Sequence, residues 1–258
     1  MARHSGMSGA SPRVYWPAIM NKISDNLQAV QARIAAALQA CGRPAGTVSL
    51  LAVAKTWPAA DVQTAWNAGQ RAFGENYVQE GVTKITALAG LPIEWHFIGP
   101  LQGNKTRLVA EHFSWVQGLD RLKMAERLAV QRPPHLPPLN VCLQVNVSGE
   151  ASKGGVAPDE VLPLAQAVAR LPRLRLRGLM TIPEPSEDEA LLRQRFRQVR
   201  ELRDHLEAAG LPLDTLSMGM SHDFELAITE GATLVRVGTA IFGARVPQGV
   251  RQAQNDCR

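Results

Sequence analysis

The chain has 258 residues and a formal net charge of +5, with 45% hydrophobic and 20% charged residues. This composition is typical of a folded globular protein and excludes a largely disordered chain. The length fits one large domain, such as an α/β barrel, or two smaller ones. The positive charge favours an anionic partner, but aromatic residues make up only 5% of the chain, which disfavours a protein that stacks single-stranded nucleic acid.

Three scattered cysteines, Cys41, Cys142 and Cys257, form no CxxC pair. They predict neither a disulfide framework nor a structural zinc site, and they favour a reducing cytoplasm. No apolar run approaches the length of a membrane span. The first 22 residues lack the apolar segment of a secretory signal peptide. We therefore expect a cytoplasmic protein without membrane attachment.

The first periodic segment is Ile23–Ala40, where apolar residues recur at helical spacing. The next segment, Thr47–Ala54, is a short apolar run without alternation, which is typical of a strand buried on both faces. Pro58 and Gly69 then mark the beginning and the end of a helix. Later strands are predicted at Arg71–Gly74, Ile93–Ile98, Phe113–Gln117, Val141–Val147, Leu174–Met180, Thr215–Met218 and Thr233–Val237. Later helices are predicted at Tyr77–Leu88, Lys105–Ala110, Arg121–Val130, Asp159–Ala169, Asp188–Ala209 and Ser221–Glu230.

Eight strands that alternate with helices predict a parallel sheet with right-handed crossovers. Their number and total length are typical of a (β/α)8 TIM barrel. We predict this barrel over residues 21–246, after a flexible arm at 1–20 and before a flexible tail at 247–258. Met20 is an alternative to Met1 as the natural start. A doubly wound open sheet is the alternative fold, although no GxGxxG follows the first strand as dinucleotide binding would require.

Active sites of such barrels lie at the carboxyl ends of the strands. Lys55 stands at this position, directly after the apolar run of the first strand. Desolvation lowers the pKa of a lysine amine, which frees the neutral amine to form a Schiff base with a carbonyl compound. The alternative is a lysine that extends from the strand end into solvent, and the pattern alone favours neither.

The loops after the seventh and eighth strands are the usual phosphate site of these barrels. Ser221 is predicted as a helix N-cap, where its hydroxyl group and the following amides would face an anion. Gly238 and Thr239 offer close backbone approach and a second hydroxyl group. For each feature alone, ordinary capping or turn chemistry is the alternative. Arg236 lies in an otherwise apolar strand and needs a ligand or an ion-pair partner for its charge.

Seven sequence blocks, in order along the chain, resemble one known family. The blocks are LLAVAKT (50–56), FGENYVQE (73–80), EWHFIGPLQGNK (94–105), VNVSGEASKGG (145–155), RGLMTIPEP (177–185), LSMGMSHDFELAI (216–228) and VRVGTAIFGAR (235–245). They resemble the pyridoxal phosphate homeostasis proteins, single-domain relatives of the alanine racemase barrel domain. Small departures from the family pattern at Gly103, Gly154, His222 and Phe224 concern individual contacts and not the cofactor.

The resemblance implies an alanine racemase N-terminal-domain-like barrel that holds pyridoxal 5′-phosphate (PLP) as a Schiff base on its strand-end lysine. The implied cofactor contacts are Lys55, Asn76, His96, Met218, Ser221, Arg236, Gly238 and Thr239. Among these, Ser221, Gly238 and Thr239 would hold the phosphate, with Asn76 near it. Arg236 would face the pyridine nitrogen. No catalytic residue and no metal site are implied.

An arginine beside the pyridine nitrogen can only donate hydrogen bonds, so it keeps that nitrogen unprotonated. An unprotonated ring is a weaker electron sink. Alanine racemases supply a tyrosine base from a second domain, whereas this sequence ends at Arg258, soon after the last predicted strand. These points favour a non-catalytic protein that holds PLP and delivers it to apo-enzymes, with a weak amino-acid racemase as the alternative. We expect a monomer, with neither nucleic acid nor membrane as a partner.

Overall fold

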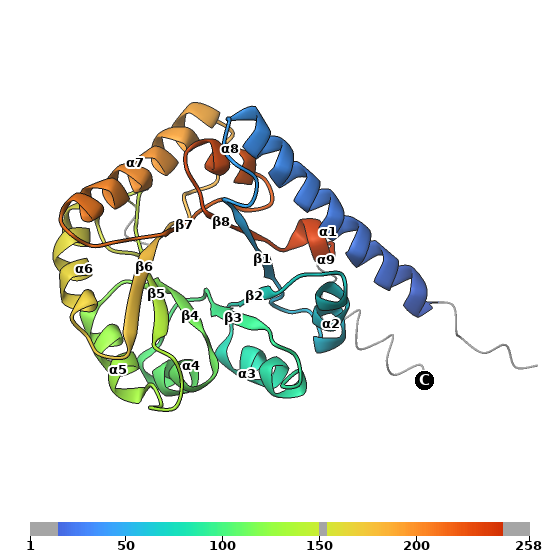
Figure 1. Cartoon of the computed structure of the whole chain (residues 1–258), viewed down its shortest axis with the longest axis horizontal. Coiled ribbons are helices and arrows are strands. Elements are labelled where there is room, and N and C mark those ends of the chain that lie inside the picture. Colours follow the sequence, from blue (N-terminus) through green and yellow to red (C-terminus); the bar gives the residue numbers. More distant parts are fainter. Residues whose placement is uncertain (1–14, 150–153, 245–258) are drawn as a thin grey trace, which may run out of the picture.

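Eight parallel strands form a closed barrel in which each strand pairs with the next and β8 pairs with β1 (Figure 1). The computed structural model describes residues 15–149 and 154–244, with side chains from residue 22 onward. The strands are β1 (Ser49–Val53), β2 (Ala72–Glu75), β3 (Glu94–Phe97), β4 (Trp115–Leu119), β5 (Leu139–Gln144), β6 (Leu174–Met180), β7 (Thr215–Ser217) and β8 (Leu234–Val237). The closure confirms the predicted (β/α)8 barrel and excludes an open sheet.

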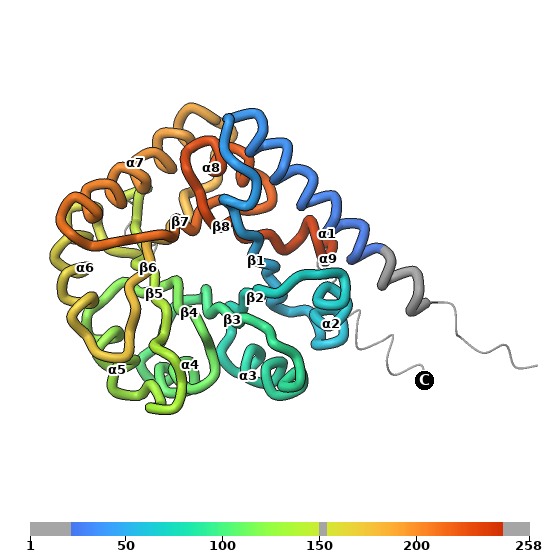
Figure 2. The backbone as a smooth tube through the Cα atoms, viewed as in Figure 1, coloured from blue at the N-terminus to red at the C-terminus, as the bar shows by residue number. Residues whose placement is uncertain are grey.

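Helices surround the barrel, and Figure 2 shows the chain passing from central strands to outer helices and back. The helices are α1 (Tyr15–Ala40), α2 (Ala59–Asn67), α3 (Val78–Ala87), α4 (Thr106–His112), α5 (Leu122–Gln131), α6 (Val161–Ala169), α7 (Glu189–Ala208), α8 (Phe224–Thr229) and α9 (Thr239–Phe242), with 3-10 turns η1 (Gly103–Lys105) and η2 (Pro158–Glu160). The leading helix α1 packs against α2, α8 and α9 along one side of the barrel. None of the helices in the described ranges is long and apolar enough to cross a membrane.

Two predicted boundaries are wrong. Helix α1 begins at Tyr15 instead of Ile23, so residues 15–20 of the expected arm are helical. Pro17 is compatible with this start because a proline in the first helical turn loses no hydrogen bond. Helix α8 begins at Phe224 instead of Ser221. Residues 1–14 and 247–258 lie outside the described residues, so the predicted arm and tail stay predictions.

The barrel interior combines apolar and polar side chains. Because side chains alternate between the two faces of a strand, one set points into the barrel and the other meets the helices. The apolar interior residues are Leu51, Ile98, Trp115, Cys142, Met180 and Leu234. Four polar side chains, His96, Gln117, Ser217 and Arg236, are also buried there. Buried polar groups require hydrogen-bond partners, and these four bond to one another.

The contact between β7 and β8 is the shortest ladder of the barrel. It contains one register pair, Ser217 with Leu234, whereas β5 and β6 share six pairs. The loops that follow β7 and β8 contain Ser221 and Thr239. The two loops predicted to bind phosphate therefore flank the least extensively paired strands.

Candidate functional site

A cavity of about 220 Å³ opens at the carboxyl-terminal end of the barrel. Its lining consists of Val53, Lys55, Trp57, Asn76, Ile98, Ile182, Met220, Ser221, His222, Arg236, Gly238 and Thr239. The structure thus brings six of the eight predicted contact residues together around one space, although they come from β8 and from loops after different strands. The other two, His96 and Met218, do not line this cavity.

Lys55 lies in a tight turn directly after β1. The amide of Trp57 donates to the carbonyl of Ala54 at 3.0 Å, which closes a four-residue turn. Thr56, at the third position, has a φ of +68°. Turns with a positive φ at this position favour glycine, and a non-glycine residue held there costs about 1–3 kcal/mol. The backbone that carries Lys55 is therefore strained.

The loop after β7 is a turn rather than the start of a helix. The carboxylate of Asp223 accepts from the Met220 amide at 2.6 Å, and the amides of Asp223 and Phe224 both donate to the Met220 carbonyl. This turn delays α8, so the prediction of Ser221 as its N-cap is wrong. Ser221 instead lies within the turn and lines the cavity.

Two hydroxyl groups, of Ser221 and Thr239, and one glycine, Gly238, belong to the lining. Within the described ranges, neither Ser221 nor Thr239 uses its hydroxyl group in a hydrogen bond to the protein. At Gly238, an added Cβ atom would lie 3.1 Å from the Val53 carbonyl oxygen, so glycine keeps this backbone close to β1. The arrangement leaves hydrogen-bond donors directed at the cavity.

Arg236 is the buried cation of the site. Its Nη1 donates to the carbonyl and the hydroxyl oxygen of Ser217 at 2.6 and 2.8 Å, and its Nη2 donates to the Thr181 carbonyl at 2.8 Å. Burial lowers the pKa of Arg236 to about 10, against the opposing effect of Asp223. The guanidinium therefore stays protonated at pH 7, and its plane is fixed at the base of the cavity.

A chain of hydrogen bonds runs from Arg236 through the barrel interior. Ser217 Oγ donates to Gln117 Oε1 at 2.6 Å, and Gln117 Nε2 donates to His96 Nδ1 at 2.8 Å. His96 Nε2 donates to Glu94 Oε1 at 2.8 Å, where the glutamate side chain is 51% exposed. Burial lowers the pKa of His96 despite the adjacent carboxylate, so a neutral ring with one donor and one acceptor fits this chain.

The structure places the two remaining predicted residues elsewhere. His96 is fully buried and reaches the cavity only through Gln117, Ser217 and Arg236. Met218 is fully buried in the core between the sheet and the helices. Since Ser217 points into the barrel, its neighbour Met218 points outward. Direct cofactor contact by either residue is not supported by this placement.

Sequence reasoning does not identify six of the lining residues, which are Val53, Trp57, Ile98, Ile182, Met220 and His222. Alternation along the strands could have placed Val53 and Ile98 on the inner face. Trp57 stacks on Phe242 with ring centroids 5.8 Å apart. The two residues are far apart in the sequence, so no local pattern predicts this contact. His222 is exposed at the cavity, and its departure from the family pattern was the available signal.

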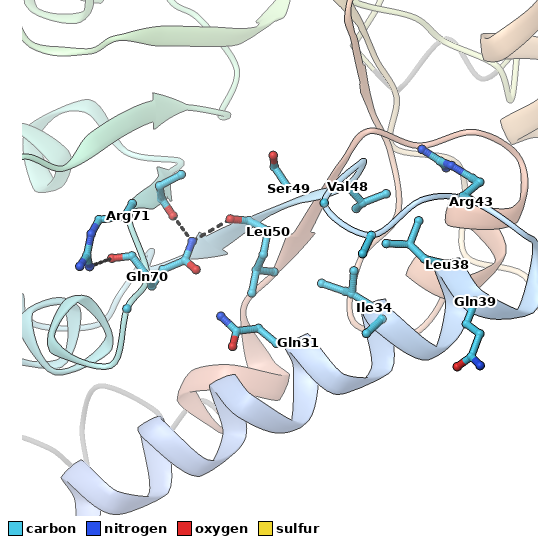
Figure 3. A pocket seen from close by; sticks show the side chains of 15 residues that line it. Gln31, Ile34, Leu38, Gln39, Arg43, Val48, Ser49, Leu50, Gln70 and Arg71 are labelled. Atoms are coloured by element: carbon cyan, nitrogen blue, oxygen red, sulfur yellow. Dashed lines mark hydrogen bonds between the residues drawn. The ribbon is translucent and has the colours of Figure 1, made fainter.

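A larger cavity of about 750 Å³ lies at the opposite, amino-terminal end of the barrel, beside α1, β1 and β2 (Figure 3). Three of its polar side chains, those of Arg43, Gln70 and Arg71, are bonded to the protein backbone. Gln70 Nε2 donates to the carbonyls of Leu50 and Ala72 at 2.7 Å each. Arg43 Nη1 donates to two carbonyls near the end of α8 at 2.8 Å each. No predicted site residue lines this cavity.

Comparison with known proteins bears on these observations. The sequence model of the family "Alanine racemase, N-terminal domain" matches residues 26–246. A pyridoxal phosphate homeostasis protein from Pseudomonas aeruginosa is 61% identical over 226 residues, which cover 88% of this chain and 97% of that protein. The chain belongs to the pyridoxal phosphate homeostasis protein family. The Escherichia coli K12 pyridoxal phosphate homeostasis protein is 54% identical over 229 residues, covering 88% of this chain and 98% of its own.

Solved structures agree with this family assignment. PipY from Synechococcus elongatus, solved with PLP bound, has a TM-score of 0.75 at 37% identity and covers 86% of this chain and all of its own. Alanine racemase from Corynebacterium glutamicum has a TM-score of 0.67 at 15% identity and covers 89% of this chain and 63% of its own, a likeness of fold alone. The resemblance of this chain to the pyridoxal phosphate homeostasis proteins, predicted from seven sequence blocks, is confirmed.

Proposed function

We propose that this protein binds PLP as a Schiff base on Lys55 and acts in PLP homeostasis and delivery without significant catalytic turnover. The observation that carries the proposal is the joint lining of one cavity by a primary amine, a buried guanidinium and two hydroxyl groups that bond to none of the described residues. The names of the homeostasis relatives and the PLP bound to PipY support it.

The residues present fit the chemistry of this cofactor. The amine of Lys55 would hold the aldehyde by a reversible condensation that releases one water molecule, which suits storage and release. Ser221 and Thr239 would hold the phosphate group, and Gly238 would allow the backbone to approach it. Asn76 lines the same cavity. PLP supplies an electron sink when bound.

Arg236 supports the non-catalytic part of the proposal. A protonated guanidinium has donors and no acceptor, so it stabilises an unprotonated pyridine nitrogen and weakens the electron sink. The bonds to Ser217 and Thr181 hold it in this role. The resulting protein keeps a reactive aldehyde bound and available, and apo-enzymes that need PLP are the proposed recipients.

The test of this proposal is reductive trapping. Borohydride should fix the mass of PLP on Lys55, and the visible absorbance of the imine should be absent in Lys55→Ala. The matched control is Lys123→Met, which removes an exposed lysine and should change neither result. A main label on another lysine, or no label, would reject the assignment.

One observation favours the racemase alternative: His222 lines the cavity and is a base that could face a bound amino acid. The decisive measurement incubates loaded protein with L-alanine in deuterated water and follows α-deuteration and D-alanine. The carrier proposal expects little turnover together with transfer of PLP to an apo-enzyme. Sustained D-alanine formation at about 1 s⁻¹ or faster, lost in His222→Asn, would establish the racemase instead.

A further inference from the structure

Three charged side chains, two of them buried and one partly exposed, form a cluster next to the Lys55 turn. Glu75 ends β2, and Glu80 and Lys84 lie one helical turn apart on α3. Lys84 Nζ is 2.8 Å from Glu75 Oε1 and 2.6 Å from Glu80 Oε1. The side chains of Lys84 and Glu75 are 6% and 0% exposed. Removing such charges from water costs free energy. We therefore ask which part of the structure the cluster holds in place.

The cluster holds the backbone on both sides of Lys55. Lys84 Nζ donates to the carbonyl of Ala54 at 2.7 Å. Glu80 Oε1 accepts from the amide of Thr56 at 2.5 Å. The residue before Lys55 and the residue after it are therefore both fixed by the same ion-paired group. Neither contact involves the side chain of Lys55.

These contacts fall on the strained part of the turn. Thr56 adopts a φ of +68°, and a β-branched residue keeps such a conformation only where surrounding contacts impose it. The Glu80 carboxylate bonds the amide of that residue, and Lys84 holds the carbonyl that begins the turn. Without them, the threonine is expected to relax to a negative φ, which would redirect the preceding side chain.

The cluster also has an electrostatic effect on the lysine. Glu75 interacts electrostatically with Lys55 as well as with Lys84 and Glu80. When Glu75 is ionised, its carboxylate favours a positive charge on the Lys55 nitrogen.

We propose that Lys84, acting with Glu75 and Glu80, is a positioning residue that imposes the strained turn and so directs the Lys55 amine into the cavity. The link to PLP rests on the proposed function, whereas the control of the turn does not. Lys84 touches no cavity atom; it acts through the carbonyl of Ala54 and, through Glu80, the amide of Thr56.

The test compares Lys84→Met with Arg132→Met. Arg132 is the matched control, because it is also a buried cation that bonds backbone carbonyls, those of Ala110 and Phe113, away from Lys55. In Lys84→Met, hydrogen exchange of the Thr56 amide should accelerate at least ten-fold and the PLP dissociation constant should rise at least ten-fold. Arg132→Met should lower thermal stability and change neither quantity.

A rescue experiment separates positioning from a general loss of stability. Glycine adopts a positive φ without strain, so Thr56→Gly added to Lys84→Met should restore most of the PLP affinity. If Lys84→Met does not fold, Glu80→Ala replaces it, since this variant removes the bond to Thr56 and keeps the Lys84–Glu75 pair. Glu80→Ala should then show the same two changes.

Two results overturn the proposal. One is an unchanged exchange rate at Thr56 in a folded Lys84→Met or Glu80→Ala protein. The other is a loss of PLP affinity that Thr56→Gly does not rescue. If the unaltered protein forms no imine with PLP, the proposed function fails, and the Thr56 exchange rates still decide whether Lys84 controls the turn.

Discussion

The two ends of the barrel differ in what their polar groups bind. At the amino-terminal end the cavity is larger, about 750 Å³ against 220 Å³, but Gln70 and Arg43 are bonded to backbone carbonyls of the protein. At the carboxyl-terminal end, Ser221 and Thr239 leave their hydroxyl groups to the smaller cavity. The comparison shows that the two cavities differ in the chemical groups that line them: an amine, a guanidinium and two hydroxyl groups meet around the smaller one, so volume alone does not identify the candidate binding site.

The strongest way to break this comparison is to remove both hydroxyl groups. In the double variant Ser221→Ala, Thr239→Val, PLP affinity should fall by about 100-fold or more, because each neutral donor to a charged group contributes about 1.5–3 kcal/mol. The unfolding free energy of the PLP-free protein should change by less than about 0.5 kcal/mol, since neither hydroxyl group bonds any residue that the structure describes. A spectroscopic titration with PLP measures the affinity, and an unchanged value would place the phosphate elsewhere.

The buried carboxyl group of Glu75, which lies at the carboxyl-terminal end of the barrel, should make the unfolding free energy of the protein depend on pH. Burial raises the pKa of Glu75 from 4.5 to about 7 against the influence of Lys84, so the folded protein binds this proton more tightly than the unfolded chain. The stabilisation is complete below pH 4.5 and is lost as pH rises to 7, about 3 kcal/mol in all. Urea unfolding at pH 5 and pH 8 should show this loss, and Glu75→Gln should remove it. Glu187→Gln, at an exposed position, serves as the control and should keep it.

Ser217 lies inside the barrel, between its amino-terminal and carboxyl-terminal ends. Its substitution should change both the unfolding free energy and the PLP affinity. Ser217→Ala removes one acceptor from Arg236 and the donor to Gln117, and a buried group left without its partner costs about 1–3 kcal/mol. Unfolding free energy should fall by that amount and PLP affinity several-fold, because Arg236 keeps its two carbonyl partners. Thr215→Val, in the same strand, should affect stability alone. Equal effects on affinity in both variants would contradict a specific link from Ser217 to the cavity.

The smallest effect on binding is expected at the amino-terminal end. Gln70→Met removes two hydrogen bonds to backbone carbonyls and should lower the unfolding free energy by about 1–2 kcal/mol. PLP affinity should stay within two-fold of the unaltered protein. A larger change in affinity would show that the two ends are coupled and that the distinction drawn above is too simple.

The sequence was sufficient for the architecture because strand and helix periodicity are local. The strand Leu174–Met180 was predicted with its observed ends, and the other strand boundaries differ by at most three residues. The short helix α9 was not predicted, since four residues carry no periodic signal. The start of α8 was placed too early because the Asp223–Met220 bond competes with helical capping.

The direction of side chains was harder to predict than the elements. His96 and Met218 belong to motifs near the site, yet barrel closure turns one into the interior and the other toward the helices. The spacing of Glu80 and Lys84 is visible as an i, i+4 pair, but their contacts with Ala54 and Thr56 depend on how α3 packs beside β1. Such relations follow from long-range packing and not from the local sequence.

The short β7–β8 ladder has a consequence for the opening motions of the barrel. Beyond its single register pair, this contact is held by backbone bonds from the amides of Thr233, Met218 and Arg236, and the two strands lead directly into the loops of Ser221 and Thr239. A phosphate group held by both loops would link β7 and β8 beyond the end of their ladder. At a PLP concentration of 100 times the dissociation constant, binding adds about 2.7 kcal/mol to the unfolding free energy. The PLP-bound and PLP-free proteins would then share one fold and differ in how often the barrel opens between β7 and β8.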